Sequence, residues 1–213
     1  MSGSRGFTYD SCSSGDRLSR EYVARTPASW TVGLFDGKFC YQFPSVGPFY
    51  EVLINATTGK VADCDFFCLI GTSNISDNKP EVSLRKRDYT VAGAPFNPGE
   101  LIIVIDNTNV QLFLADNITT RLVASAAHGI AWDVTKLYNL RIRLRGKTLQ
   151  VKVWARTAAE PNWMVTAYMV YLTFQINANG FWAVRPANAS AGGARTMYFS
   201  DLRVTPIRKV GGP

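Results

Sequence analysis

The carboxylates best placed for catalysis in this 213-residue chain are Asp63 and Asp65, which alternate along an expected strand. Alternate strand residues share one face of a sheet, so two carboxylates spaced in this way could flank one glycosidic bond as nucleophile and acid. The same spacing suits two ordinary side chains on the solvent side of a strand. No third acid follows Asp63 and Asp65 at the spacing that a catalytic set would need, since residue 68 is a cysteine. We therefore expect no catalytic residues and no enzyme.

The parts of a nucleophilic triad are also missing from the sequence. His128 is the only histidine, and no G-x-S-x-G element supplies a serine nucleophile. Glycine-rich motifs that cradle phosphate groups are absent as well. We expect His128 to lie in a loop or at a sheet edge and not to act as a base.

Neither the cysteines nor the loop acids predict a metal site. The cysteines do not form two close pairs, so we expect reduced apolar side chains, with a disulfide formed after release as the open alternative. They are Cys12, Cys40, Cys64 and Cys68. Oxygen donors of the kind calcium prefers gather in one region; they are Asp106, Asn107, Asn109, Asp116 and Asn117. Because Asp and Asn are also ordinary turn residues, we expect no metal and no cofactor.

The strongest binding candidates lie on one predicted hairpin, whose sequence from 137 to 156 is LYNLRIRLRGKTLQVKVWAR. Two strict alternations meet at Gly146-Lys147, a pair suited to a two-residue primed turn. Pairing across this turn places Leu144, Ile142 and Leu140 opposite Leu149, Val151 and Val153. The other face then carries a candidate surface for glycan or protein contact, composed of Arg141, Arg143, Gln150, Lys152 and Trp154. An ordinary solvated face remains the alternative.

The remaining pattern is that of an all-β domain. Asp36-Gly37 predicts a hairpin within residues 31–43, and residues 106–109 predict another between strands 100–105 and 110–115. We expect residues 49–54 and 61–69 to pair about Thr58-Gly59, and residues 82–91 to form an edge strand because Arg85, Lys86 and Arg87 deter foreign strands. Further strands are expected at 120–125, 164–174, 180–184 and 196–206. No amphipathic helix is evident, so the sequence predicts an antiparallel sandwich or barrel.

The chain divides into an arm at 1–29, a sandwich at 30–207 and a basic tail at 208–213. The arm lacks strand or helix periodicity, and we expect it to lie along a neighbouring subunit, adding buried area and backbone hydrogen bonds. The residues expected to make that contact are Arg5, Phe7, Tyr9, Arg17, Arg20 and Tyr22. The first residues contain no apolar core, so we expect no secretory leader, and no apolar run predicts a membrane partner.

The formal net charge of +7 favours anionic partners. This charge is dispersed, and Arg85-Lys86-Arg87 is the only tight cluster. Acidic residues also dilute the arginines of the arm. The distribution argues against a nucleic-acid partner and against an RNA-binding viral coat protein.

Several stretches between residues 130 and 206 carry a family resemblance: WDVTKLYNLRIRLRGKTLQVKVWA, EPNW, INANGFWAVRPAN and ARTMYFSDLRV. Their order is similar to that of the concanavalin A-like lectin/glucanase superfamily: a hairpin, an E-P-x-W connection, a Gly-initiated strand and a last strand ending in D-L-x-V. Residues 30–130 agree with it only in strand number. The resemblance implies a two-sheet jelly-roll sandwich. Retaining glycosidases of this fold carry E-x-D-x-x-E, which is absent here.

Domains of this kind occur in lectins, laminin-type modules, glycoside hydrolases and surface proteins of tailed-phage virions. We expect a non-enzymatic virion structural protein of a tailed phage, either a capsid decoration (cement) protein or a tail-surface adhesin, assembled in the host cytoplasm. Its expected partners are other capsid or tail proteins, copies of itself and host surface glycans. The alternatives are a free carbohydrate-binding module and, less favoured, a glycoside hydrolase.

Overall fold

The computed structural model describes residues 7–8, 22–24, 31–45, 52–54, 63–76, 78–86, 100–115, 120–168, 181–188 and 195–207. These residues form strands and their connections, with no helix among them. The described part of the chain accordingly contains no helical segment able to span a membrane.

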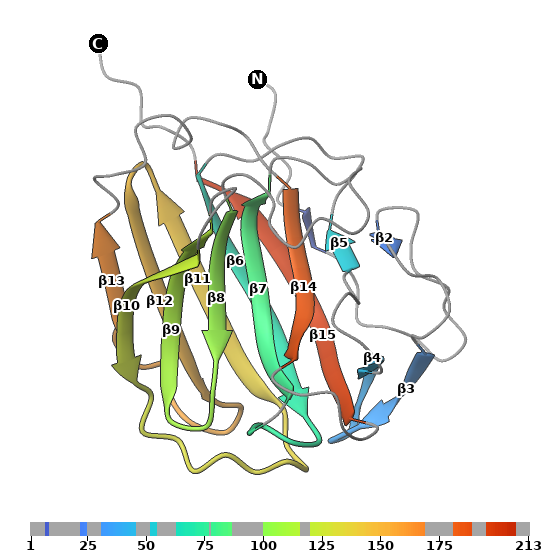
Figure 1. Cartoon of the computed structure of the whole chain (residues 1–213). Helices are drawn as coiled ribbons and strands as arrows, with labels where there is room; N and C mark the ends of the chain where they lie inside the picture. The colour runs from blue at the N-terminus through green and yellow to red at the C-terminus, as the bar shows by residue number, and fades with distance from the viewer. Residues whose placement is uncertain are drawn as a thin grey trace.

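Two antiparallel sheets face each other in a sandwich (Figure 1). The eight-stranded sheet runs in the order β13 (Val165–Tyr168), β12 (Thr148–Ala155), β11 (Tyr138–Arg145), β6 (Cys64–Thr72), β15 (Arg195–Pro206), β4 (Lys38–Ser45) and β3 (Thr31–Phe35), with β1 (Phe7–Thr8) also paired to β15. The seven-stranded sheet runs in the order β10 (Thr120–Ala127), β9 (Asn109–Ala115), β8 (Glu100–Ile105), β7 (Asn78–Lys86), β14 (Phe181–Asn188), β5 (Val52–Ile54) and β2 (Tyr22–Ala24). This arrangement confirms the predicted jelly-roll sandwich.

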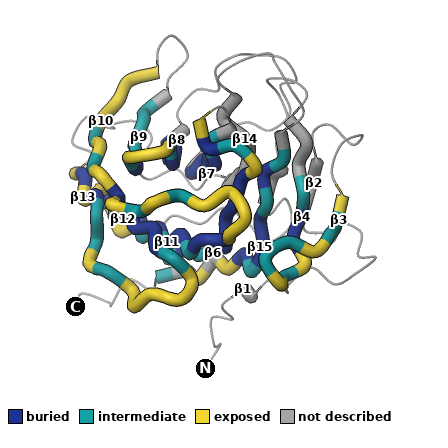
Figure 2. The backbone as a smooth tube through the Cα atoms, turned by 90° about the horizontal axis from the view of Figure 1, so that it is seen from below, coloured by how far each residue is buried: buried dark blue, intermediate teal, exposed yellow. Residues whose placement is uncertain are grey.

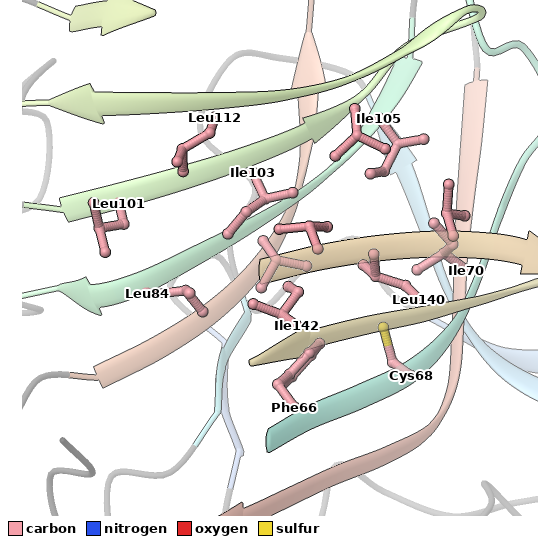
Figure 3. Packing of buried hydrophobic residues seen from close by; sticks show 14 of the residues in the cluster. Phe66, Cys68, Ile70, Leu84, Leu101, Ile103, Ile105, Leu112, Leu140 and Ile142 are labelled. Carbon is pink, nitrogen blue, oxygen red and sulfur yellow. The ribbon is translucent and has the colours of Figure 1, made fainter. Parts of the chain in front are cut away.

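Strand alternation builds the core between the two sheets. In β11, Leu140, Ile142 and Leu144 are fully buried while the residues between them are not. Alternate residues of β8, including Ile103 and Ile105, face them from the seven-stranded sheet (Figure 3). Figure 2 shows buried positions along strands of both layers. The inner face of the β11–β12 hairpin is therefore used entirely for packing.

The predicted register of the β11–β12 hairpin is confirmed at every pair. Leu144 lies opposite Leu149, and Arg141 lies opposite Lys152. Arg145 and Thr148 close a two-residue turn in which Gly146 has a φ of 56°. A positive φ at the first turn residue is what a Gly-X primed turn requires. A one-residue slip would have exchanged the apolar and charged faces, so burial specifies this register.

Two other predictions, one of a strand pairing and one of an edge position, are wrong. Residues 49–54 and 61–69 do not form a hairpin, because β5 pairs with β14 and β2 while β6 pairs with β11 and β15. The segment 82–91 was expected at an edge, but β7 lies between β8 and β14. Val82 and Leu84 belong to the core, and Arg85 and Lys86 come only at the end of the strand. Local charge and turn signals did not reveal these long-range partners.

Other strands and turns match the sequence-based predictions closely. β8 and β9 pair across the turn at 106–108, and β3 and β4 pair across Asp36-Gly37, whose φ values are 46° and 72°. The last strand, β15, covers the predicted 196–206. The division into arm, sandwich and tail stays a prediction; residues 208–213 lie outside the described residues, and β1 and β2, within the predicted arm, pair with β15 and β5.

Candidate functional site

The five side chains predicted for binding come together on the solvent side of the eight-stranded sheet. Two rows of neighbouring residues cross this side. One row runs Arg203, Phe67, Arg141, Lys152 from β15 to β12. The other runs Thr205, Asp65, Arg143, Gln150, Thr166 from β15 to β13. We call these residues, with Trp154 and with Glu160 and Trp163 from the following loop, the hairpin face.

Asp65 anchors the centre of the hairpin face. Its carboxylate accepts a forked pair of hydrogen bonds from Arg143, with Nε at 2.8 Å and Nη2 at 3.1 Å. The side-chain hydrogen bond to Asp65 raises the pKa of Arg143 above its usual value. Arg141 approaches the same carboxylate at 3.7 Å. Arg143 lies directly opposite Asp65 on the adjacent strand, and the fork fixes the orientation of this pair, while Arg141 reaches the carboxylate from the diagonal position.

Glu160 brings the loop after β12 onto the hairpin face. Its carboxylate lies 2.8 Å from Arg141 Nη1 and 2.8 Å from Lys152 Nζ. Lys152 Nζ also donates to the carbonyl oxygen of Pro161 at 2.9 Å. The hydrogen bond from Lys152 is the main cause that holds the pKa of Glu160 below its ordinary value, with Arg141 adding to it. The E-P-x-W connection is thus a strap held by two cations.

Aromatic rings fill the space between these charges. The Trp163 ring lies 4.3 Å from Lys152 Nζ and 5.1 Å from the Arg143 guanidinium carbon. Arg203 lies over Phe67 at 5.7 Å, and no carboxylate pairs with it among the described residues. Phe67 and Trp163 are only half-buried. Cation–ring contacts of this kind contribute about 0.5–1 kcal/mol at exposed sites and more when desolvated.

Trp154 shares the hairpin face as predicted but is only 9% exposed. It packs against Phe67 at a centroid distance of 6.3 Å. The rings accessible to a ligand are therefore Phe67 and Trp163, which sequence reasoning missed. Trp163 was not among the candidate residues. Its signal was its position in the E-P-x-W connection directly after the hairpin.

Sequence reasoning did not assign three other residues to the hairpin face, and the reason is different: Asp65, Phe67 and Arg203. Each lies on the same side of its strand as the predicted residues, but β6 and β15 join the hairpin through contacts far apart in sequence. Of the predicted arm contacts, Phe7 lies in β1 and Tyr22 in β2. The other four, Arg5, Tyr9, Arg17 and Arg20, lie outside the described residues.

The two candidate catalytic acids both have structural partners. Asp63 accepts a hydrogen bond from the backbone N–H of Gly146 at 2.8 Å, which fixes the hairpin turn. Asp65 is held in the fork with Arg143. The cations nearest to Asp65 are Arg143 at 2.8 Å and Arg141 at 3.7 Å, so this carboxylate is engaged in ion pairs.

A further carboxylate, Glu81, lies on the opposite side of the molecule. Val82 and Leu84 of β7 face the core, so Glu81 and Ser83 face outward from the seven-stranded sheet. Glu81 is only 6% exposed, and Ser83 Oγ donates to its carboxylate at 3.5 Å. The alternate position thus holds a hydroxyl group instead of a second acid.

The side chains of His128 and Asp106 form hydrogen bonds with backbone groups. His128 Nδ1 accepts from the N–H of Ile130 at 3.1 Å, so Nε2 carries the proton donated to the carbonyl of Asp106 at 3.0 Å. Burial raises the pKa of Asp106, but the hydrogen bonds from Thr108 N and Asn109 N outweigh it and hold that pKa below its ordinary value. Both residues therefore have structural roles.

Metal-binding and disulfide chemistry find no support in the described part of the chain. No group of three acids, cysteines or histidines there could hold a metal ion. Asp116 and Asn117 lie outside the described residues, as does Cys12. Cys40, Cys64 and Cys68 are buried and form no disulfide with one another, and burial raises the pKa of Cys68 well above its usual value.

Comparison with known proteins identifies the fold. No protein-family model and no curated protein sequence matches the chain. Among solved structures, a Bacteroides ovatus GH16 protein of a mixed-linkage glucan utilisation locus, in complex with a G4G4G3G product, is similar at 9% identity over 93% of this chain and 99% of that one, with a TM-score of 0.68.

Two further solved structures are similar over comparable lengths. The carbohydrate-binding module CBM66 from Bacillus subtilis matches at 16% identity and a TM-score of 0.56, covering 87% of this chain and 95% of that one. The exoplasmic/lumenal domain of VIP36, bound to Ca²⁺ and mannose, matches at 12% identity and a TM-score of 0.59, covering 97% and 83%. The chain therefore has the concanavalin A-like jelly-roll fold, which it shares with carbohydrate-binding modules, lectins and GH16 glycoside hydrolases.

Proposed function

We propose that the chain is a non-catalytic, lectin-like adhesion module that binds acidic glycans through the hairpin face. The observation that carries this proposal is the row in which Arg203 and Arg141 flank Phe67. Adjacent strands are about 4.8 Å apart, so the four-residue row from Arg203 to Lys152 extends over roughly 14 Å. A ring between two guanidinium groups offers stacking to a sugar and charge to its acidic substituent.

The charge balance favours an anionic ligand. The hairpin face carries four cations, at 141, 143, 152 and 203, and two carboxylates, at 65 and 160. Its net charge is positive, and Arg203 is the cation without a carboxylate partner among the described residues. The ion pairs of Arg141 and Arg143 orient their remaining N–H groups, so a ligand would meet an arranged set of donors.

A binding role accounts for the carboxylates better than catalysis does. Asp63 and Asp65 are held by the hairpin turn and by Arg143, and Glu81 has Ser83 at the alternate position. A retaining glycosidase requires two carboxyl groups about 5–5.5 Å apart, one of them free to hold a proton. The fold itself is compatible with either activity.

A glycan array, run with and without calcium, tests this function. We expect binding to oligosaccharides that carry carboxylate or sulfate groups, independent of calcium and weakened by added salt. In a follow-up titration, Arg203→Ala should weaken binding by about tenfold, the loss of one charge-assisted contact. Arg121→Ala, on the other sheet, is the matched control and should have no effect. Turnover of any oligosaccharide, or equal losses in both variants, would contradict the proposal.

We further propose that this module belongs to the surface of a tailed-phage virion, as capsid decoration or as a tail adhesin. The non-periodic segment 1–29 and the absence of a catalytic acid set in the sequence support this assignment. Mass spectrometry of gradient-purified particles should detect the chain in fixed proportion to the major capsid or tail protein. Its absence from purified particles would contradict a virion role while leaving glycan binding standing.

A further inference from the structure

The four strands that end the two sheet orders, β10, β13, β2 and β3, differ in how well they are protected from pairing with another chain. On one side of the sandwich, β10 and β13 lie next to each other (Figure 1 and Figure 2). β10 also carries Arg121 and a bulge between Leu122 and Ala124. On the other side, β2 is only three residues long. Charges, bulges and shortness are the usual ways of preventing an edge from pairing with another chain.

The fourth edge, β3, has none of these protections. Its sequence, TVGLF, contains no charge and no proline, and its pairing with β4 has no register shift. Leu34 is 66% exposed, and its cross-strand neighbour Phe39 is 36% exposed. Within the described residues, β3 pairs with β4 alone. An unprotected edge beside an exposed apolar pair is a template for one more strand.

The charges around β3 allow a second copy of the chain to supply that strand. Two copies of a chain with a net charge of +7 repel each other, so a contact between copies is favoured where the surface is neutral. Residues 31–35 are uncharged. At the adjoining turn, Asp36 is paired with Lys136 at 3.4 Å and with Arg156 at 3.1 Å, and Lys38 is paired with Asp201 at 3.2 Å. Among the described residues, a second copy therefore meets no unpaired like charge at this edge.

We propose that β3 pairs with β3 of a second copy, antiparallel about a two-fold axis at Gly33. This register is the one in which all five residues of each strand find a partner. It places Val32 opposite Leu34 of the other copy and Thr31 opposite Phe35, so the contact is self-complementary, as a two-fold interface must be. The eight-stranded sheets of the two copies join into one sheet, and Leu34 and Phe39 lose solvent contact.

The size of the contact sets its strength. Stable interfaces bury about 1,600 Å² in total, and five paired residues with two apolar side chains supply only part of that area. The dimer is therefore weak in dilute solution and forms where copies are concentrated, as on a particle surface.

Sedimentation equilibrium of the full chain over a wide concentration range tests the proposal. The wild type is expected to show a monomer–dimer equilibrium. Leu34→Lys should raise the dissociation constant by at least about tenfold, because it places two like charges at the contact. Leu122→Lys is the matched control, because Leu122 is 49% exposed and lies on β10; it should leave the equilibrium unchanged. Circular dichroism confirms that each variant is folded.

Amide hydrogen exchange provides a second measurement that does not depend on a variant. The amides of residues 31–35 should exchange more slowly at high protein concentration, while those of β10 should not change. A wild type that remains monomeric at every concentration, equal effects of the two lysine variants, or concentration-independent exchange of residues 31–35 would each overturn the proposal. If the protein is monomeric at every concentration, a strand of a different protein is the remaining candidate to pair with β3.

Discussion

The two hairpins β11–β12 and β3–β4 have similar turns but different surroundings. Both close with two residues, Gly146-Lys147 in one and Asp36-Gly37 in the other, and both have positive φ at the first turn residue. β11–β12 has neighbours on both sides, and the strap with Glu160 and Trp163 lies on its outer face. β3–β4 ends the sheet and exposes Leu34.

This difference shows that turn chemistry specifies a hairpin but not its use. A hairpin inside a sheet is packed on its inner face and can offer only its outer face for binding. A hairpin at the end of a sheet also offers backbone groups. The hairpin face therefore suits a glycan, and the β3 edge suits another strand.

The largest expected difference between the hairpins concerns core side chains. Ile142→Ala should lower the free energy of unfolding by about 2–5 kcal/mol, because it leaves a cavity in a fully buried region. Leu34→Ala should change it by no more than about 0.5 kcal/mol, because Leu34 is exposed. Urea unfolding of both variants measures the effects. Equal losses would mean that β3–β4 is as deeply packed as β11–β12.

The next effect concerns the ion pairs of each hairpin. Asp65→Ala leaves Arg143 without its forked partner and should lower the free energy of unfolding by about 1.5 kcal/mol. Lys38→Ala removes a single contact with Asp201 and should cost about 0.5 kcal/mol or less. If the two costs are the same in chemical denaturation, the network on the hairpin face adds nothing beyond an ordinary surface pair.

A smaller effect is expected at the turn of the central hairpin. Gly146→Ala forces a side chain into φ of 56° and should cost about 1 kcal/mol, although no atom lies within 4 Å of the added carbon. Lys147→Ala, at the other turn residue, should be neutral and serves as the control. Thermal unfolding of the pair isolates the backbone contribution. A neutral Gly146→Ala would contradict the primed turn.

The smallest effect is a pH dependence of the strap. The pKa of Glu160 is lower in the folded protein than in the unfolded chain, where it is near 4.5. Its ion pairs therefore contribute to the free energy of unfolding above pH 4.5, and this contribution is lost as the pH falls through the pKa of the folded protein. Trp163 fluorescence in the folded protein should therefore change below pH about 4.5. Glu160→Gln should remove that transition. Persistence of the transition in this variant would assign it to another acid.

The sequence was sufficient for the fold class and for local pairing. Strict alternation and Gly146-Lys147 predicted every pair of β11–β12, because burial of one face leaves a single register. It was insufficient where partners are distant: β7 was misplaced at an edge and β5 was wrongly paired with β6. The hairpin face was predicted only on the hairpin itself, since Asp65, Phe67 and Arg203 arrive on strands whose neighbours local pattern does not encode.

Residue-resolved NMR titration with an acidic oligosaccharide selected on the array tests the central claim most directly. We predict chemical-shift changes confined to the outward residues of β15, β6, β11 and β12 and to the strap, with the sugar recovered intact. Shifts centred instead on Glu81 and Ser83 of the seven-stranded sheet, or cleavage of the sugar during the titration, would contradict it.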